Sequence, residues 1–261
     1  MELNLPIEVA CGYKSLSQKA RVITEAWALE NMYCPACTAD RLNPTETGAE
    51  AVDFFCSRCD SQYQLKAVSK PFGRKIVDAA YGAMMRAIAR DQLPHFMLLS
   101  YDNTAAAVND LLVIPKFCLP RSAIEARKPL APTARRAGWV GCNILLNLVP
   151  PEGRISVINS GIVVPKSKVR DDFRLIQPLS NLSVKLRGWT LDVLTVLRSM
   201  NRNDFTLDDA YRFENILADR HPENRHIRAK IRQQLQILRD LGYLKFVTPG
   251  HYCWEEKRII S

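Results

Sequence analysis

Histidine is scarce in this sequence, and long apolar runs are missing. The 261 residues include four histidines, which are spread along the chain at positions 95, 221, 226 and 251. This scattering argues against a catalytic or metal site built from a histidine cluster. No apolar run approaches the roughly 18 residues of a membrane-spanning helix, which excludes a spanning segment. The start, MELNLPIEVA, lacks the basic and apolar regions of a secretory signal, so we expect a cytoplasmic protein without a membrane partner.

Acidic residues are outnumbered as well. Lysine and arginine total 36 against 27 aspartate and glutamate residues, which gives a formal net charge of +9. A basic surplus of this size favours a polyanionic partner, although charge by itself identifies none. Hydrophobic residues make up 47% and charged residues 24%, the balance of a globular protein rather than a disordered one. The length suffices for two ordinary domains or one large one.

The eight cysteines are distributed unevenly. Four of them form two Cys-x-x-Cys pairs, Cys34 with Cys37 and Cys56 with Cys59, separated by eighteen residues. Two thiolate pairs at this spacing can close a tetrahedral Zn²⁺ site, and four thiolates leave no open position for water, so this zinc is expected to be structural. The alternative, disulfides, requires an oxidising compartment. The remaining cysteines lack a second pair and are interpreted as ordinary buried residues: Cys11, Cys118, Cys142 and Cys253.

Hydrophobic periodicity indicates a mixed pattern of helices and strands through residue 165. Apolar spacing predicts helices over residues 15–31 and 74–91. Strands are expected over residues 51–55, 63–66, 95–101 and 111–116, and residues 154–164 are typical of a hairpin that turns at Ser160-Gly161. The second cysteine pair lies at the turn between the first two strands. The pattern indicates an α/β or α+β fold.

A different pattern follows residue 165. Residues 166–181 have the charged, proline-containing composition of a linker. Helices are then expected over residues 190–200, 206–219 and 224–241, followed by strands over 243–247 and 251–254 around Pro249-Gly250. Thr206 with Asp209 forms an approximate capping box at the start of the second helix. Three helices followed by a two-stranded ribbon indicate a winged helix, a variant of the helix-turn-helix.

The last predicted helix is strongly basic. Residues 224–239 hold five basic side chains and no acidic one, and apolar residues recur on a single face. The other faces carry Arg225, Arg228, Lys230, Arg232, Gln233, Gln234, Gln236 and Arg239. In the major groove Arg pairs with guanine and Gln with adenine, while further basic side chains contact phosphates. We therefore favour a DNA-reading helix over the alternative, a solvated face, because solvated faces usually alternate in charge sign.

A second basic cluster lies at residues 121–136. It holds five basic residues against Glu125 alone: Arg121, Arg127, Lys128, Arg135 and Arg136. Prolines and Gly138 indicate a loop, and Trp139 follows it directly. A tryptophan beside such a loop can stack on bases or wedge between them, but it is equally explained as a core residue. Both interpretations stay open.

The hairpin around the second cysteine pair carries polar residues. Asp53 lies on the strand before the pair, and Gln64 and Lys66 lie two apart on the strand after it, so they share one face. An acidic residue opposite a carboxylate-x-Lys triplet is the arrangement of PD-(D/E)xK nucleases, which hold Mg²⁺ against a scissile phosphate. By itself this spacing is weak evidence, since any polar hairpin face could produce it.

The sequence resembles the DpnI family of methyl-directed restriction endonucleases over nearly its whole length. The similarity is carried by residues 17–27, by both cysteine pairs, by Asp53, Gln64 and Lys66, and by residues 127–144 (RKPLAPTARRAGWVGCNI). Further along, it is carried by residues 187–190, 205–214 and 230–240. The resemblance implies a PD-(D/E)xK nuclease domain over residues 1–180, with a zinc-binding segment at 34–59, and a winged-helix domain over residues 181–261.

The resemblance also implies a function. It implies a monomeric prokaryotic type II restriction endonuclease that cleaves double-stranded DNA at GATC sites carrying N6-methyladenine. Asp53 and Gln64 would bind the catalytic Mg²⁺, and Lys66 would complete the catalytic set. Both domains would contact DNA. The residues expected to do so are Arg127, Lys128, Arg135, Arg136, Trp139, Arg225, Arg228, Arg232 and Gln233.

One position departs from the family pattern. The family motif has Glu where this chain has Gln64. A Gln carbonyl can still ligate Mg²⁺, yet the loss of one negative charge weakens affinity for a hard cation. Glu25 and Glu50 are candidates to supply that charge. The alternative function is therefore a catalytically weak or inactive zinc-ribbon and winged-helix protein that reads methylated DNA.

Overall fold

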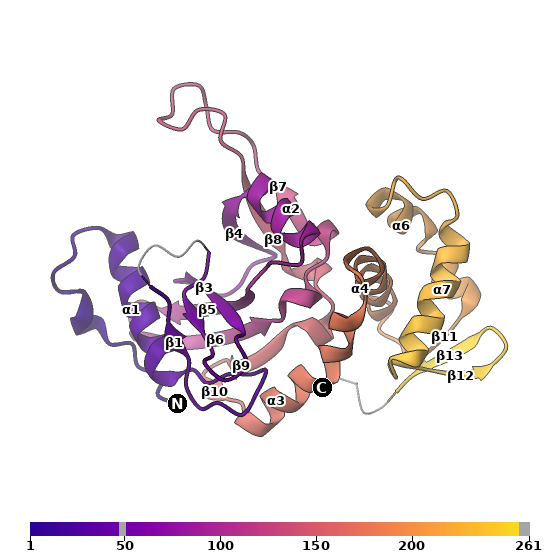
Figure 1. Cartoon of the computed structure of the whole chain (residues 1–261), viewed down its shortest axis with the longest axis horizontal. Coiled ribbons are helices and arrows are strands. Elements are labelled where there is room, and N and C mark those ends of the chain that lie inside the picture. The colour runs from indigo at the N-terminus through magenta and orange to yellow at the C-terminus, as the bar shows by residue number, and fades with distance from the viewer. Residues whose placement is uncertain (47–50, 256–261) are drawn as a thin grey trace. The chain divides into compact units, whose positions relative to one another are not determined.

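The computed structural model describes residues 1–46 and 51–255 (Figure 1). Contacts between residues divide the chain into two compact units. The first comprises Met1–Gly73, Leu93–Lys116 and Gly153–Arg174, and the second comprises Arg74–Gln92, Phe117–Glu152 and Leu175–Ser261. The expected domain boundary at residue 180 falls within the second unit and stays a prediction.

A mixed sheet forms the centre of the first unit. Its strands are ordered β1-β2-β3-β5-β6-β9-β10, with β3 and β5 parallel and the other neighbouring pairs antiparallel. The strands are β1 Asn43–Pro44, β2 Phe54–Phe55, β3 Gln62–Val68, β5 His95–Asp102, β6 Ala107–Ile114, β9 Ile155–Asn159 and β10 Ile162–Val163. Helix α1 (Leu16–Asn31) and all but the last two residues of α3 (Lys166–Ile176) belong to the same unit. The expected mixed α/β fold is confirmed.

The central strand β5 anchors the core of the first unit. Its first seven residues are all buried, as expected for a strand covered on both faces. His95 opens this strand, 5.2 Å from the ring of Tyr63 and 5.3 Å from the ring of Phe173 between centroids. Its Nδ1 accepts a hydrogen bond from the Lys116 N–H at 3.0 Å. Burial lowers the pKa of His95 to about 3, so the ring is neutral in the folded protein.

The second unit contains a smaller antiparallel sheet and the winged helix. The sheet orders β4-β8-β7, and the wing orders β11-β13-β12. Their strands are β4 Lys75–Ala80, β7 Ile124–Ala126, β8 Gly141–Leu145, β11 Asp204–Thr206, β12 Leu244–Thr248 and β13 His251–Trp254. The helices are α2 Tyr81–Ala89, α4 Val184–Arg198, α5 Leu207–Tyr211, α6 Glu214–Arg220 and α7 Ile227–Asp240. The expected winged helix is confirmed, and β11 adds a third strand to its ribbon.

Two predicted elements are wrong. Residues 74–91 do not form one helix, because β4 precedes α2. Along β4 the buried residues Ile76 and Asp78 alternate with exposed ones, a period of two that suits pairing with β8. Residues 166–181 are not a linker but α3 followed by a 3-10 helix, Gln177–Asn181. Val169 and Phe173 lie four residues apart and are both buried, so this segment has an apolar helical face despite its charge.

The predicted hairpin turn and the predicted helix cap are both confirmed. The hairpin of β9 and β10 turns at Ser160 and Gly161, with φ of 50° and 76°, the left-handed values that a tight hairpin turn requires. Thr206 and Asp209 form the expected capping box. The helix predicted over residues 206–219 is nevertheless divided into α5 and α6, and α4 begins at Val184, earlier than expected.

Asp192 of α4 holds three segments of the second unit together. Its side chain is 1% exposed. Oδ1 accepts hydrogen bonds from Ser122 Oγ at 2.5 Å and from Arg220 Nη1 at 3.1 Å. Oδ2 lies 2.9 Å from His221 Nε2, and that ring stacks on Trp189 at 3.6 Å between centroids. A buried carboxylate with these partners is strongly held, so removing one partner would be costly.

The cysteines outside the two pairs differ in exposure. Cys118 and Cys142 are buried, as expected. Cys11 is exposed and Cys253 is partly exposed, so the interpretation of these two as buried residues is wrong. Within the described part of the chain, no helix combines the length and the apolar character needed to cross a membrane.

We expect the His95→Asn variant to change how stability depends on pH. The His95 pKa of about 3 lies below the ordinary value of 6.5. Between these two pKa values, His95 binds a proton in the unfolded chain but not in the folded chain. Protonation of the unfolded chain therefore lowers the free energy of unfolding as the pH falls from 6.5 toward 3, by at most about 1.4 kcal/mol per pH unit, and has no effect above pH 6.5. Asn keeps an acceptor for the Lys116 N–H but does not titrate. Urea unfolding at pH 7.5 and pH 5.0 should show a smaller loss for His95→Asn than for the unchanged protein; equal losses would contradict the linkage.

Candidate metal centre and catalytic cleft

The four paired cysteines meet in space. Their sulfur atoms all lie within 4.8 Å of one another. Cys34 Sγ is 3.6 Å from Cys59 Sγ, and Cys37 Sγ is 3.6 Å from Cys56 Sγ. Four sulfurs at about 2.3 Å from a tetrahedral ion would stand about 3.8 Å apart, whereas a disulfide requires about 2.05 Å. The cysteines therefore form a cluster with the donor set and spacing of a metal site, and all four are free thiols.

Two residues outside the cluster hold it in place. The Tyr63 hydroxyl lies 3.1 Å from Cys34 Sγ, and burial raises the pKa of this hydroxyl, which keeps it protonated and able to donate. Arg170 of α3 donates to the Cys34 carbonyl at 3.3 Å and to the Ala39 carbonyl at 2.8 Å. Such partners orient metal ligands and are part of the site. Sequence reasoning missed Arg170, which lies in the segment expected to be a linker.

The same hairpin brings the predicted catalytic residues together. In the antiparallel register Phe54 pairs with Tyr63, so Asp53 lies opposite Gln64. The Asp53 N–H donates to the Tyr63 carbonyl at 2.9 Å, and Asp53 Oδ2 accepts from the Leu65 N–H at 2.8 Å. Gln64 is buried, and Lys66 follows on the same face of β3, half-buried. Asp53, Gln64 and Lys66 thus share one region of the strand pair.

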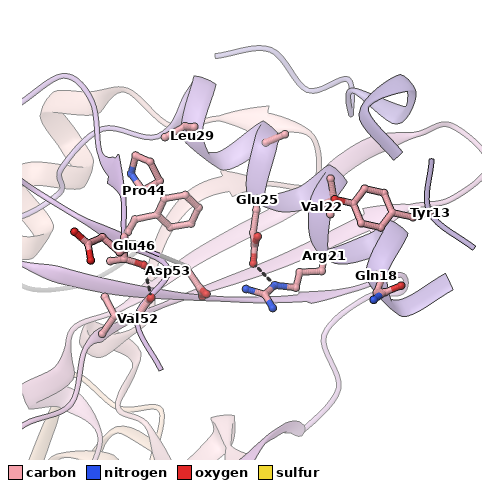
Figure 2. A pocket seen from close by; sticks show the side chains of 13 residues that line it. Tyr13, Gln18, Arg21, Val22, Glu25, Leu29, Pro44, Glu46, Val52 and Asp53 are labelled. Atoms are coloured by element: carbon pink, nitrogen blue, oxygen red, sulfur yellow. Dashed lines mark hydrogen bonds and ion pairs between the residues drawn. The ribbon is translucent and has the colours of Figure 1, made fainter. Parts of the chain in front are cut away.

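A cleft of about 790 Å³ opens beside Asp53. Helix α1 lines it with Arg21, Val22, Glu25 and Leu29, while Pro44–Glu46 and Val52–Phe54 line it from the hairpin side. Figure 2 shows Glu25 and Asp53 reaching the same cleft from these two elements. Glu25 is therefore placed to add a negative charge beside Asp53. Glu50, the other candidate, lies outside the described residues.

Arginine also reaches this cleft. Arg21 Nε donates to Glu25 Oε1 at 2.6 Å, across one turn of α1. The hydrogen bond and charge of Glu25 raise the pKa of Arg21, and the more distant Asp53 adds to this effect. The cleft thus combines carboxylates, which suit a hard cation, with one guanidinium, which suits a phosphate. Arg21 was not selected from the sequence, although it lies within the block of residues that carries the family resemblance.

The basic loop between β7 and β8 is long and hairpin-like, and it extends away from the small sheet (Figure 1). Its base is closed by a bond from the Arg127 N–H to the Gly141 carbonyl and one from the Leu130 N–H to the Trp139 carbonyl, both 2.9 Å. The four basic residues predicted to contact DNA in this loop are exposed: Arg127, Lys128, Arg135 and Arg136.

Trp139 is partly exposed, and its ring packs against neighbouring residues. The ring is half-buried, and a Cβ at position 141 would come within 2.9 Å of it, so the ring packs directly on the Gly141 backbone. The Arg136 guanidinium lies over the ring, 5.0 Å from its centroid. The ring is therefore held in a set orientation, with part of its surface exposed.

Helix α7 presents most of its predicted basic residues to solvent. Arg225, Arg228, Arg232 and Gln233 are exposed, and the apolar stripe of the helix is buried. Gln234 is an exception to the predicted solvent face. It is fully buried and accepts a hydrogen bond from Thr190 Oγ1 at 2.7 Å, so it supports packing of α7 on α4.

The exposed arginines of α7 already have partners. Arg228 Nε donates to Glu214 at 2.7 Å, and Arg232 hydrogen-bonds the Tyr211 hydroxyl. Both guanidinium groups also lie near the Tyr211 ring, at 5.0 and 5.6 Å from its centroid. Gln233 accepts from Lys230 Nζ at 2.7 Å. Sequence reasoning missed Tyr211 and Glu214, whose proximity to α7 depends on how α5 and α6 pack against it.

Comparison with known families agrees with this arrangement. The family model for DpnI, the Dam-replacing family, matches residues 1–182. The model for its C-terminal domain, the Dam-replacing HTH domain, matches residues 185–253. The first match covers the four-cysteine cluster and the cleft beside Asp53, and the second covers most of the winged helix. The chain therefore belongs to the DpnI family, with a methyl-directed restriction endonuclease domain followed by a helix-turn-helix DNA-binding domain.

Proposed function

We propose that this protein is an Mg²⁺-dependent type II restriction endonuclease that cleaves double-stranded DNA at GATC sites containing N6-methyladenine. The observation that carries the proposal is the placement of Asp53 opposite Gln64, beside a cleft, in a chain of the DpnI family. We further propose that the enzyme acts as a monomer in the cytoplasm of a prokaryote.

The reaction is hydrolysis of a phosphodiester. The oxygen of a water molecule attacks phosphorus, and the bond from phosphorus to the leaving sugar oxygen breaks. One proton leaves the water and one is taken up by the leaving oxygen, so a phosphomonoester and a hydroxyl result. Lys66 orients the water or stabilises the charge that develops on the phosphate. Asp53, the Gln64 carbonyl and Glu25 would hold Mg²⁺ as oxygen donors. When bound, the ion supplies Lewis-acid stabilisation of the phosphate oxygens.

The Gln64 amide is the feature that favours a second candidate function. Without a carboxylate at this position, the hairpin alone offers one negative charge to the cation. A protein of this kind could bind methylated DNA without cutting it. Glu25 supports the nuclease instead, because it lines the cleft with Asp53 and offers a second carboxylate there, with one oxygen bound to Arg21.

We propose that the four-cysteine cluster holds Zn²⁺. Four thiolates at these separations match tetrahedral zinc and close the site to substrate, so its role is structural. The cluster supports the catalytic hairpin directly, because Tyr63 both contacts Cys34 and accepts the Asp53 N–H hydrogen bond.

Reading of the methyl group requires more than one contact. N6-methylation puts an apolar group in the major groove, and burying it contributes about 1 kcal/mol, which is less than a tenfold preference. Strong methyl dependence therefore needs several contacts or penalties against the unmethylated site. We assign these contacts to Trp139, to Arg225 just before α7, and to Arg228, Arg232 and Gln233 of α7. The remaining basic side chains of the loop, Arg127, Lys128, Arg135 and Arg136, contact phosphates.

The first prediction concerns zinc. Folded protein should contain one equivalent of zinc by elemental analysis, and Cys56→Ser should lower that content. Because Tyr63 joins the cluster to the hairpin, chelation should also expose the hairpin to hydrogen exchange. Cys11→Ser is the control, since Cys11 is an exposed cysteine outside the cluster. Folded protein without metal would refute the assignment.

The second prediction concerns catalysis. Incubation with Mg²⁺ should fragment adenine-methylated plasmid and leave unmethylated plasmid intact. Asp53→Asn should lower the cleavage rate about a hundredfold or more, because the loss of a metal ligand removes several kcal/mol of stabilisation. Asn can still accept the Leu65 N–H, so the hairpin and DNA binding should survive.

Asp60→Asn provides the matched control for this substitution. Asp60 is exposed on the same hairpin turn and has φ of 55°, which Asn tolerates. It should cleave like the unchanged protein. If unchanged protein binds methylated DNA but does not cut it at any Mg²⁺ concentration, the second candidate function is correct.

The third prediction concerns the methyl group. Trp139→Ala should reduce cleavage of methylated sites far more than it reduces binding to nonspecific DNA. Arg135→Ala should weaken binding to all DNA evenly and lower its salt dependence. Leu130→Ala is a matched control, because Leu130 is a partly exposed apolar residue of the same loop. Trp139→Phe tests whether an aromatic ring in this place suffices. An unchanged ratio of methylated to unmethylated cleavage in Trp139→Ala would identify Trp139 as a packing residue.

A further inference from the structure

We infer that Arg21 is a further catalytic residue of the cleft, whose guanidinium contacts a phosphate oxygen of the DNA strand being cleaved, and that Glu25 holds it in position. This inference rests on the proposed nuclease function. It assigns a role to a side chain outside the hairpin.

The Arg21–Glu25 pair contributes little as a stabilising contact of the helix. The Arg21 side chain is 71% exposed and the Glu25 side chain 31%. Pairs spaced by four residues on an exposed helix contribute only a few tenths of a kcal/mol, and the order with the acidic residue first is the better one. Here the basic residue comes first. Fold stability therefore does not account for the pair.

The hydrogen bonding of Arg21 leaves donors available for a substrate. A guanidinium has five N–H donors in a planar fork, and Nε–H is used for Glu25 at 2.6 Å. Within the residues that the structure describes, the terminal amino groups donate no hydrogen bond. A planar group held at Nε, with both amino groups available, matches the bidentate geometry of a phosphate.

Arg21 adds positive charge to an acidic cleft. Glu25, Glu46 and Asp53 all line it, so a phosphate bound beside these carboxylates is repelled unless positive charge is added, and Arg21 would add to the charge of the proposed Mg²⁺. Arg21 lines the same cleft from α1, and Figure 2 shows its guanidinium beside the Glu25 carboxylate. A positioned guanidinium also stabilises the charge that develops on the phosphate during hydrolysis.

The test compares Arg21→Gln with Arg21→Lys and with Lys19→Gln. Lys19 lies on the same helix but does not line the cleft. Single-turnover cleavage of a methylated duplex is measured over a range of Mg²⁺ concentrations. Duplex affinity is measured separately with each substitution combined with Asp53→Asn, which prevents cleavage.

We expect Arg21→Gln to lower the single-turnover rate about a hundredfold at saturating Mg²⁺, in line with the loss of one positioned donor group. Duplex affinity should change less than about threefold, because one phosphate contact among many is lost. Arg21→Lys should recover part of the rate through its charge, and Lys19→Gln should leave it unchanged. Because Arg21 is exposed, thermal unfolding should be nearly the same in all variants.

Three results would overturn the inference. Arg21→Gln could cleave at the unchanged rate, or its rate could return fully at high Mg²⁺, which would place Arg21 in metal binding instead. Equal losses in Arg21→Gln and Lys19→Gln would indicate a general charge effect. If the unchanged protein does not cleave at all, the proposed function itself fails, and this outcome is distinct from the other three.

Discussion

The pairing of β2 with β3 is the constraint on which both sites of the first unit depend. Tyr63 lies at its centre. Its carbonyl accepts the Asp53 N–H, its hydroxyl contacts Cys34 Sγ, and its ring lies against His95 of the central strand. A slip of this pairing by one residue would turn Asp53 away from Gln64 and separate the cysteine pairs at once. β2 contains two residues, too few to define a register alone. The cysteine cluster therefore helps to fix the register between β2 and β3.

The charge balance of the cleft gives Gln64 a different meaning from the one that sequence alone suggests. In the sequence, Gln64 stands where the family motif has a carboxylate. In the folded protein it is buried opposite Asp53, which lines a cleft together with Glu25 and Glu46. A further buried carboxylate there would raise the repulsion among these groups and toward phosphate. A neutral amide still offers an oxygen ligand without adding that charge. The substitution is therefore compatible with a working site in which α1 shares the electrostatic task with the hairpin.

Much of the fold was predictable from sequence, and the failures have local causes. The cysteine pairs, the β2–β3 hairpin, the turn at Ser160-Gly161 and the winged helix follow from motifs within one or two elements. Strand β4 was mistaken for a helix because its apolar residues run on into the helical α2, and period two is hard to detect over six residues. The helix α3 was mistaken for a linker because its apolar face is narrow and the rest of it is charged.

The parts of the site that could not be predicted are contacts between elements distant in sequence. Nothing in the α1 sequence places Glu25 beside Asp53. In α7, Gln234 lies on the buried stripe with Ile231 and Leu238, so helical spacing could have marked it as buried, whereas Gln233 lies off that stripe and is exposed. The hydrogen-bond partner of the buried amide, Thr190 of α4, could not be predicted, because it belongs to an element distant in sequence.

The partners of the α7 arginines show how the winged helix can be ordered before DNA arrives. Arg228 pairs with Glu214 and Arg232 with Tyr211, so both side chains have lost part of their freedom already. An exposed ion pair is worth less than about 1 kcal/mol, whereas a guanidinium on a phosphate or guanine forms charged, bidentate hydrogen bonds. In the proposed complex, DNA would therefore displace Glu214 from Arg228 at little cost. The aromatic face of Tyr211 remains as a support during that exchange, because stacking on a ring does not use the N–H donors of either arginine.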